Sequence, residues 1–173
     1  MAVVLVLALA VLWPASAAVA ATKPAPCSLP SVTGERTVAL TDQGKARPFL
    51  LFVPKGYDGR GALPLVLDLH GSGGNGKGQL DASGLAKVAD GGGFAVAAPN
   101  GGVQQGPASY AWNVPGVPLI ANGQLPPAGT PDDERYLLAV IGKVAKTLCT
   151  DPRRVYITGL SGGARMTTRA HNS

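Results

Sequence analysis

The stretch VYITGLSGGARM (155–166) places a serine between glycines, directly after a β-rich segment and before a segment compatible with a helix. Gly159, Ser161 and Gly163 match the pattern G-x-S-x-G of a nucleophile elbow, in which a strand turns sharply into a helix. Small neighbours let the backbones on both sides of the turn approach closely, and the serine hydroxyl projects from it. The pattern predicts Ser161 as a nucleophile. A purely structural turn is the alternative in a chain with 24 glycines.

A second glycine-rich stretch, LHGSGGNGKG (69–78), fits motifs of three kinds of protein. It approximates the phosphate loop G-x-x-x-x-G-K-[ST], but Gly78 stands where a hydroxyl is needed for magnesium. It also matches the dinucleotide fingerprint G-x-G-x-x-G, yet the following segment FAVAAPNGG (94–102) ends without the acid that would bind ribose. Both nucleotide interpretations are therefore disfavoured.

The third interpretation is the oxyanion loop of an esterase, which begins with the pair His70 and Gly71. In it, the backbone amide of Ser72 turns toward the same point as the amide of Gly162, at the start of the helix after the nucleophile. Two amides then hold the developing oxyanion. We expect His70 to shape this loop rather than to carry a proton.

Composition bounds the class of protein. The chain has 173 residues, of which 46% are apolar and 14% charged, as expected for one globular domain. Only 5% are aromatic, and the net charge of +5 is scattered along the sequence, which disfavours a nucleic-acid partner and indicates a solvated surface. A basic patch assembled by the fold is the alternative. Nothing in the sequence requires a metal or an organic cofactor.

The N-terminus has the pattern of a secretory signal peptide. Residues 1–22 contain no charged side chain, and an apolar run over 2–12 is followed by small residues that allow cleavage after Ala20. An uncleaved membrane anchor is the alternative, since residues 2–21 could nearly span a bilayer. We expect residues 1–20 to be a signal peptide and 21–35 a leader segment. The mature protein is then secreted or periplasmic, without stable membrane association.

The chain has two cysteines, Cys27 and Cys149. An exported protein meets oxidising conditions, so one disulfide between them is the simplest prediction. In the loop-entropy account such a bond stabilises the fold by about 3–5 kcal/mol. Two unrelated buried thiols are the alternative.

Hydrophobic patterning predicts alternating strands and helices in one domain. Strands are expected over 36–40 and 47–54 with a turn over 41–46, and over 63–69, 94–99 and 154–158. A helix is expected over 79–90. The run over 63–69 is almost continuously apolar, as in a central strand covered on both faces. This order is typical of an α/β protein with a mostly parallel sheet and flanking helices.

Two further segments complete the predicted domain. Residues 101–129 are rich in glycine and proline and are expected to form a long surface loop of functional importance. A helix is expected after it, with Thr130 as its cap, Pro131 at its first position and Asp133 completing a capping box. Its apolar stripe consists of Leu137, Ile141, Val144 and Leu148.

Taken in order, these motifs resemble secreted α/β-hydrolases of the polyhydroxybutyrate depolymerase and feruloyl esterase type, which are related to carbohydrate esterase family 1. The resemblance covers about residues 36–166. It rests on the motifs VPKGYDG (53–59), LPLVLDLHGSGGNG (63–76), FAVAAPNG (94–101), WNVPG (112–116), PDDERYL (131–137) and DPRRVYITGLSGGA (151–164).

The resemblance implies hydrolysis of an ester through an acyl-enzyme, with Ser161 as nucleophile and the amides of Ser72 and Gly162 as oxyanion hole. It implies a substrate among polyhydroxyalkanoates, feruloylated or acetylated polysaccharides, or small aryl esters. Tyr110 and Trp112 would line the acyl or sugar side of the pocket, with ordinary packing as the alternative. A catalytic Asp and then a His would follow later in the chain.

Those two partners are not found after Ser161. His171 lies ten residues on, or about 15 Å along a helix, beyond hydrogen-bond reach. We therefore expect residues 36–173 to be the N-terminal part of an α/β-hydrolase domain, with about five of eight strands and the Ser161 strand at an edge. Such a fragment is expected to be inactive by itself. The alternatives are a noncatalytic secreted binding protein and an enzyme completed by a second chain.

Overall fold

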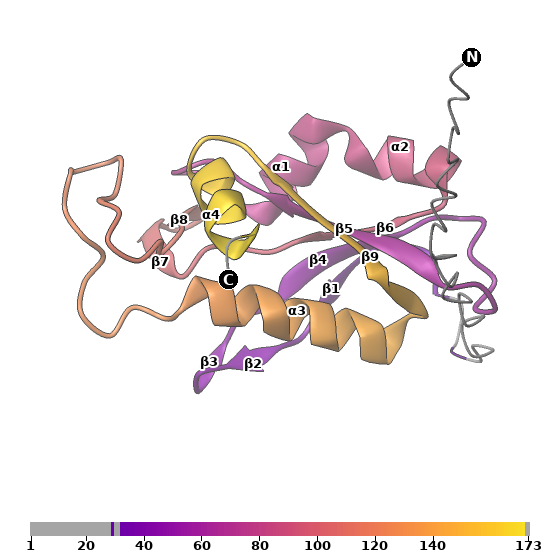
Figure 1. Ribbon diagram of the computed structural model, residues 1–173. Coiled ribbons are helices and arrows are strands. Elements are labelled where there is room, and N and C mark those ends of the chain that lie inside the picture. The colour runs from indigo at the N-terminus through magenta and orange to yellow at the C-terminus, as the bar shows by residue number, and fades with distance from the viewer. Residues whose placement is uncertain (1–28, 30–31, 172–173) are drawn as a thin grey trace, which may run out of the picture.

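The computed structural model describes residue 29 and residues 32–171, which form three layers with a β-sheet in the middle (Figure 1). The sheet has five strands in the order β1 (Gly34–Val38), β4 (Phe49–Val53), β6 (Ala95–Ala98), β5 (Leu63–Leu69) and β9 (Thr150–Gly159). β1, β4 and β6 pair antiparallel, whereas β6, β5 and β9 pair parallel. The prediction of about five strands is confirmed, and the parallel part is the half that leads to Ser161.

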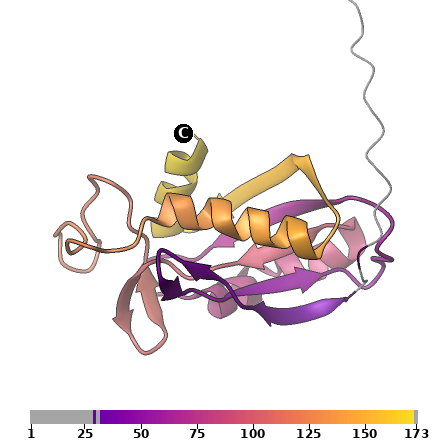
Figure 2. The same ribbon diagram turned by 90° about the horizontal axis from the view of Figure 1, so that it is seen from below.

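Helices cover both faces of this sheet (Figure 1). α1 (Gly76–Ser83) and α2 (Leu85–Gly92) lie on one face, and α3 (Asp133–Thr147) runs across the other (Figure 2). α4 (Gly162–His171) follows β9 and contacts α3. Two short hairpins lie outside the sheet, β2 (Thr41–Asp42) with β3 (Lys45–Ala46), and β7 (Val103–Gly106) with β8 (Ser109–Ala111).

The core has one apolar cluster on each side of the sheet. On the α3 side the alternate β5 residues Leu65, Leu67 and Leu69 are buried against helix residues that include Tyr136 and Val140. The predicted α3 stripe is confirmed, because Leu137, Val144 and Leu148 are buried and Ile141 packs against them. On the opposite side the smaller cluster consists of Phe52, Leu80, Ala89, Val96 and Ala98.

Three local predictions were wrong in detail. The helix expected over 79–90 is two helices, because Gly84 adopts a left-handed φ of 66° between them. The expected loop over 101–129 contains the β7–β8 hairpin. The cap of α3 is Asp132, whose side chain accepts a hydrogen bond from the Arg135 amide, rather than Thr130.

Asp133 is not part of a capping box, because its carboxylate is held elsewhere. It is fully buried and accepts hydrogen bonds from the amides of Gly102 (3.0 Å) and Asn113 (2.7 Å) and from the guanidinium of Arg47. Burial raises the pKa of Asp133, and the nearby Arg47 opposes that shift. The contacts tie both ends of the segment that contains the β7–β8 hairpin to the first turn of α3.

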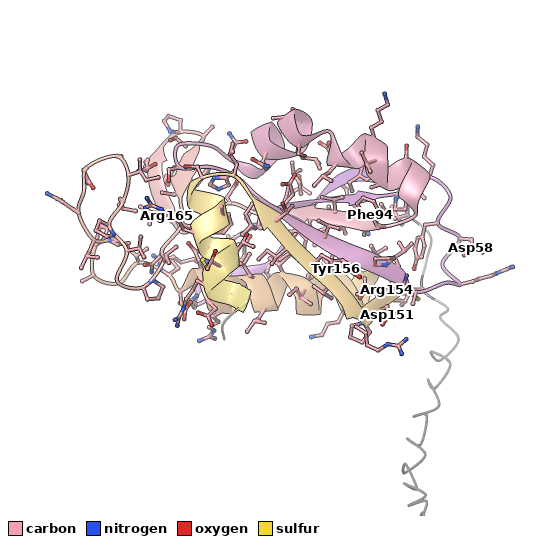
Figure 3. All side chains as sticks on the ribbon, turned by 45° about the horizontal axis from the view of Figure 1, so that its top comes forward. Asp58, Phe94, Asp151, Arg154, Tyr156 and Arg165 are labelled. Atoms are coloured by element: carbon pink, nitrogen blue, oxygen red, sulfur yellow. The ribbon has the colours of Figure 1, made fainter. Side chains whose placement is uncertain are left out.

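β9 lies at the end of the strand order, as predicted. Its side chains alternate, so that Val155 and Ile157 pack against the core while Tyr156 is 56% exposed (Figure 3). In the part of the chain that is described, no helix has the length and apolar character needed to cross a membrane. The predicted signal peptide, 1–20, and most of the leader lie outside the described residues.

Candidate functional site

Ser161 lies on the sharp turn that joins β9 to α4. Its φ is +50°, a left-handed conformation that non-glycine residues rarely adopt, and the residue is exposed. The turn is closed by hydrogen bonds from the Gly163 amide to Leu160 O (2.8 Å) and from the Arg165 amide to Ser161 O (3.2 Å). Strain at a defined residue is typical of functional positions.

The glycines around Ser161 allow close approach of three backbone segments. A Cβ on Gly159 would lie 2.6 Å from the carbonyl carbon of Gly163, closer than real side chains come. A Cβ on Gly163 would collide with the carbonyl oxygen of Leu69 and would lie 2.7 Å from that of His70. The N-terminus of α4 therefore packs directly on the end of β5, because Gly159 and Gly163 have no side chain that would keep the backbones apart.

The stretch 71–74 after β5 forms a tight turn. The Gly74 amide donates to Gly71 O (2.9 Å), and Gly73 has a φ of +84°. A positive φ at the third position is what a type II turn requires, and Ser72 then occupies the second position. The Ser72 amide has no hydrogen-bond acceptor among the described residues.

This turn and the serine turn lie side by side. A Cβ on Gly71 would be 3.6 Å from Ser161 Cβ, and one on Gly162 would be 3.2 Å from the Ser72 nitrogen. Gly162 is the first residue of α4, where an amide has no intrahelical acceptor and the helix dipole is positive. The amides of Ser72 and Gly162 are thus brought together on two turns that adjoin at Ser161.

His70 is buried (1% exposed) and both ring nitrogens are engaged by backbone. Nε2 accepts a hydrogen bond from the Gly101 amide (3.0 Å), so the proton is on Nδ1, which donates to Gly71 O (2.8 Å). Burial lowers the pKa of His70 from 6.5, with a smaller opposing effect of the hydrogen bond to Gly71. The ring is therefore neutral and has no free nitrogen for the Ser161 proton.

Tyr110 and Trp112 hold the Ser72 turn from the other side. Tyr110 exchanges backbone hydrogen bonds with it, accepting from Gly73 (2.9 Å) and donating to Gly74 (2.9 Å). Trp112 is buried, its indole Nε1 donates to His70 O (2.8 Å), and its ring lies 4.9 Å from the imidazole centroid. These contacts of Trp112 are packing contacts, which is the alternative stated for the two aromatic residues.

The structure adds residues that the motifs do not include. Beside Ser72 and Gly162 lies a narrow crevice whose other lining residues are Trp112, Val114, Val117, Pro118, Leu119, Ile120 and Arg165. Arg165 reaches this crevice from α4, where Figure 3 labels it. The loop after Trp112 has no periodic sequence pattern, so only its glycine- and proline-rich composition indicated that it belongs to the site.

Two further predictions concern cysteines and metals. Cys149 is buried and disulfide-bonded, while the predicted partner Cys27 lies outside the described residues, so their pairing stays a prediction. Within residues 29 and 32–171, no three His, Cys, Asp or Glu side chains gather as a metal site would require.

Comparisons with known proteins agree with the geometry. The chain is 31% identical over 124 residues to Feruloyl esterase B from Piromyces equi, a match that covers 72% of this chain and 21% of that protein. The crystal structure of native sOPH superposes with a TM-score of 0.59 at 25% identity, covering 83% of this chain and 49% of that chain. No protein-family model matches.

An acetyl xylan esterase from Aspergillus awamori has the same fold, with a TM-score of 0.61 at 20% identity over 79% of this chain and 46% of that chain. The chain spans about half the length of the solved structures it matches and about a fifth of Feruloyl esterase B. The fold is that of the α/β-hydrolases. The proteins matched in sequence and in structure include esterases.

The close approach at Gly159 predicts a large cost for any side chain there. Gly159→Ala is expected to lower the free energy of unfolding by about 1–3 kcal/mol, as overpacking does. The matched control is Gly142→Ala on α3, where no atom beyond the neighbouring helix backbone lies within 4 Å of the new Cβ and a stabilisation of about 0.5–1 kcal/mol is expected. Urea denaturation measures both, and equal effects would contradict the packing described for the serine turn.

The environment of His70 predicts an acid-dependent loss of stability. Its folded pKa lies below the unfolded value of 6.5, so the unfolded state binds the proton first. Stability present above pH 6.5 is therefore lost as the pH falls from 6.5 through the lower folded pKa. The slope should be smaller in His70→Gln. NMR titration of the imidazole gives the pKa directly, and a value at or above 6.5 would exclude this account.

Proposed function

We propose that the chain carries the nucleophile and the oxyanion hole of a serine ester hydrolase that acts through an acyl-enzyme. The observation that supports this most directly is the placement of Ser161 at φ +50° with the free amides of Ser72 and Gly162 beside it. A structural turn requires no free amide next to an exposed serine. The match to Feruloyl esterase B supports the same class of reaction.

In the proposed reaction the Ser161 Oγ attacks the ester carbonyl carbon and its proton passes to a general base. The carbonyl oxygen becomes an oxyanion that accepts hydrogen bonds from the Ser72 and Gly162 amides, and the α4 dipole favours this charge. The intermediate collapses as the alcohol leaves with a proton, which forms an ester on Ser161. Water then hydrolyses that ester and releases the carboxylic acid.

The general base is proposed to come from a histidine other than His70, oriented by an acid. His70 is excluded because both of its ring nitrogens are hydrogen-bonded to backbone groups. Without such a base the serine hydroxyl is a weak nucleophile, and an oxyanion hole alone gives limited acceleration. We therefore propose that the 173 residues by themselves hydrolyse esters only slowly.

The proposed substrates are esters of carboxylic acids such as feruloylated or acetylated polysaccharides, polyhydroxyalkanoates or small aryl esters. The names of the matched esterases support feruloylated and acetylated polysaccharides among these substrates. Tyr110, half-buried next to the Ser72 turn, is proposed as part of the substrate pocket. No cofactor enters the proposed reaction.

We also propose that the protein is exported. This rests on the charge-free apolar segment 1–22 and on the disulfide-bonded state of Cys149, which suits an oxidising compartment.

Export predicts a mature chain that begins at Ala21 and contains a Cys27–Cys149 bond. Intact-mass measurement on protein from the culture fluid or periplasm should give the mass of residues 21–173 less two hydrogens. Treatment with a reductant should restore those two hydrogens. Retention of residues 1–20 in the membrane fraction would instead support an anchor.

The roles of Ser161 and of the Ser72 amide can be separated by substitution. Ser161→Ala should remove the slow p-nitrophenyl acetate hydrolysis that the chain shows above the solution background. Ser72→Pro removes the amide proton together with the hydroxyl, and proline is favoured at the second position of a type II turn, so this variant should lower the slow rate to near the Ser161→Ala level.

Ser72→Ala is the matched control, since it keeps the amide and removes the hydroxyl, and its rate should stay close to that of the parent. Circular dichroism checks that the variants fold. A parent rate equal to that of Ser161→Ala, or equal rates for Ser72→Pro and Ser72→Ala, would contradict the proposed function.

A further inference from the structure

The carboxylate of Asp133 holds both ends of one segment of the chain. Asp133 is fully buried, and its Oδ2 accepts hydrogen bonds from the amides of Gly102 (3.0 Å) and Asn113 (2.7 Å). The other oxygen, Oδ1, accepts a hydrogen bond from the guanidinium of Arg47, which is 8% exposed. The two ends of the segment 102–113, which contains the β7–β8 hairpin, are therefore held together by one buried group.

The same segment holds the turn that follows β5. The backbone of Tyr110 accepts a hydrogen bond from the Gly73 amide and donates one to Gly74 O, each 2.9 Å long. The Trp112 indole donates to His70 O (2.8 Å), directly before the turn. The backbone of the turn is thus fixed by the segment whose ends the buried carboxylate holds.

A carboxylate suits this set of partners, because all three of them are donors. An Asn side chain of the same shape has one acceptor oxygen and one NH₂ group. Its NH₂ group would face either the two backbone amides or the guanidinium of Arg47, and neither can accept a hydrogen bond. A buried donor that loses its acceptor costs free energy, so Asp133→Asn should release one side of the contact with almost no change in size.

We propose that Asp133 is a positioning residue for the Ser72 amide, which it holds in place through the segment 102–113. The proposal rests on the proposed function for the use of that amide as an oxyanion donor, whereas the placement of the turn can be tested without turnover. A misplacement of about 1 Å in a site can lower a rate on the order of 10²-fold. A side chain that fixes the donor from behind therefore affects the reaction without touching the substrate.

The experiment compares Asp133→Asn with Asp151→Asn, both in the full chain. Asp151 is the matched control, because it is also a buried carboxylate that accepts hydrogen bonds from a backbone amide (Arg153, 3.0 Å) and from arginine side chains. It lies at the opposite end of β9 from the serine turn, so its loss should destabilise the fold without reaching the Ser72 turn.

The first readout is the hydrogen-exchange rate of the Gly73 and Tyr110 amides, measured by NMR and divided by the rate of the β5 amides. This division separates local opening of the turn from a general loss of stability. The second readout is kcat and KM for p-nitrophenyl acetate after subtraction of the Ser161→Ala rate.

Asp133→Asn should raise the normalised exchange rates of both amides by at least about tenfold, whereas Asp151→Asn should leave them within about twofold of the parent. In Asp133→Asn, kcat should fall toward the Ser161→Ala level while KM changes little, because the oxyanion donor acts in the transition state. Equal normalised exchange in the two variants would overturn the proposal.

Circular dichroism shows whether Asp133→Asn folds. If it does not, Trp112→Phe takes its place, since this variant removes the hydrogen bond to His70 O and keeps an aromatic ring. Unchanged normalised exchange of the Gly73 amide in that variant would also overturn the proposal. A parent rate equal to that of Ser161→Ala would reject the proposed function alone, and the exchange rates would then decide whether Asp133 places the turn.

Discussion

The parallel pairing of β5 with β9 is the constraint on which the site depends. Its register sets Leu69 opposite Gly159, so both strands end at the same level of the sheet. Immediately beyond, the Leu160 amide donates to Leu69 O (3.0 Å) and joins the two following turns. The glycines at 159 and 163 allow this approach because any Cβ would meet backbone atoms. Two turns that are far apart in sequence, at Ser72 and at Ser161, are thereby fixed side by side.

A chain of buried polar contacts supports the Ser72 turn from behind. Asp133 holds the segment of residues 102–113 at both ends, and that segment in turn supplies Tyr110 and Trp112 to the turn. The His70 ring adds two hydrogen bonds, since it donates to the carbonyl of Gly71 and accepts from the amide of Gly101. Since a buried polar group without a partner is costly, these contacts favour one conformation of the turn over others. The imidazole thus serves the geometry of the loop.

Most of the elements of the fold and the serine turn could be predicted from local sequence motifs. The five strands followed from apolar runs, the α3 stripe followed from helical spacing, and the serine turn followed from small residues at fixed positions around Ser161. Boundaries were less well predicted where backbone conformation decided them. Gly84 broke one expected helix into two. Asp132 replaced Thr130 as the cap, since the Thr130 hydroxyl donates to Pro127 O (2.6 Å) instead.

The sequence by itself therefore determined the chemical parts of this protein: the strand order along the chain, a serine on a glycine-flanked turn, and a loop with an available amide. Only the tertiary structure decided how they combine, since the β5–β9 register places Ser72 against Gly162. It also decided that both ring nitrogens of His70 are hydrogen-bonded and that the loop after Trp112 lines a crevice together with Ser72 and Gly162. The physical reason is that such contacts join residues far apart in the chain, and no local pattern of residue types encodes their distance.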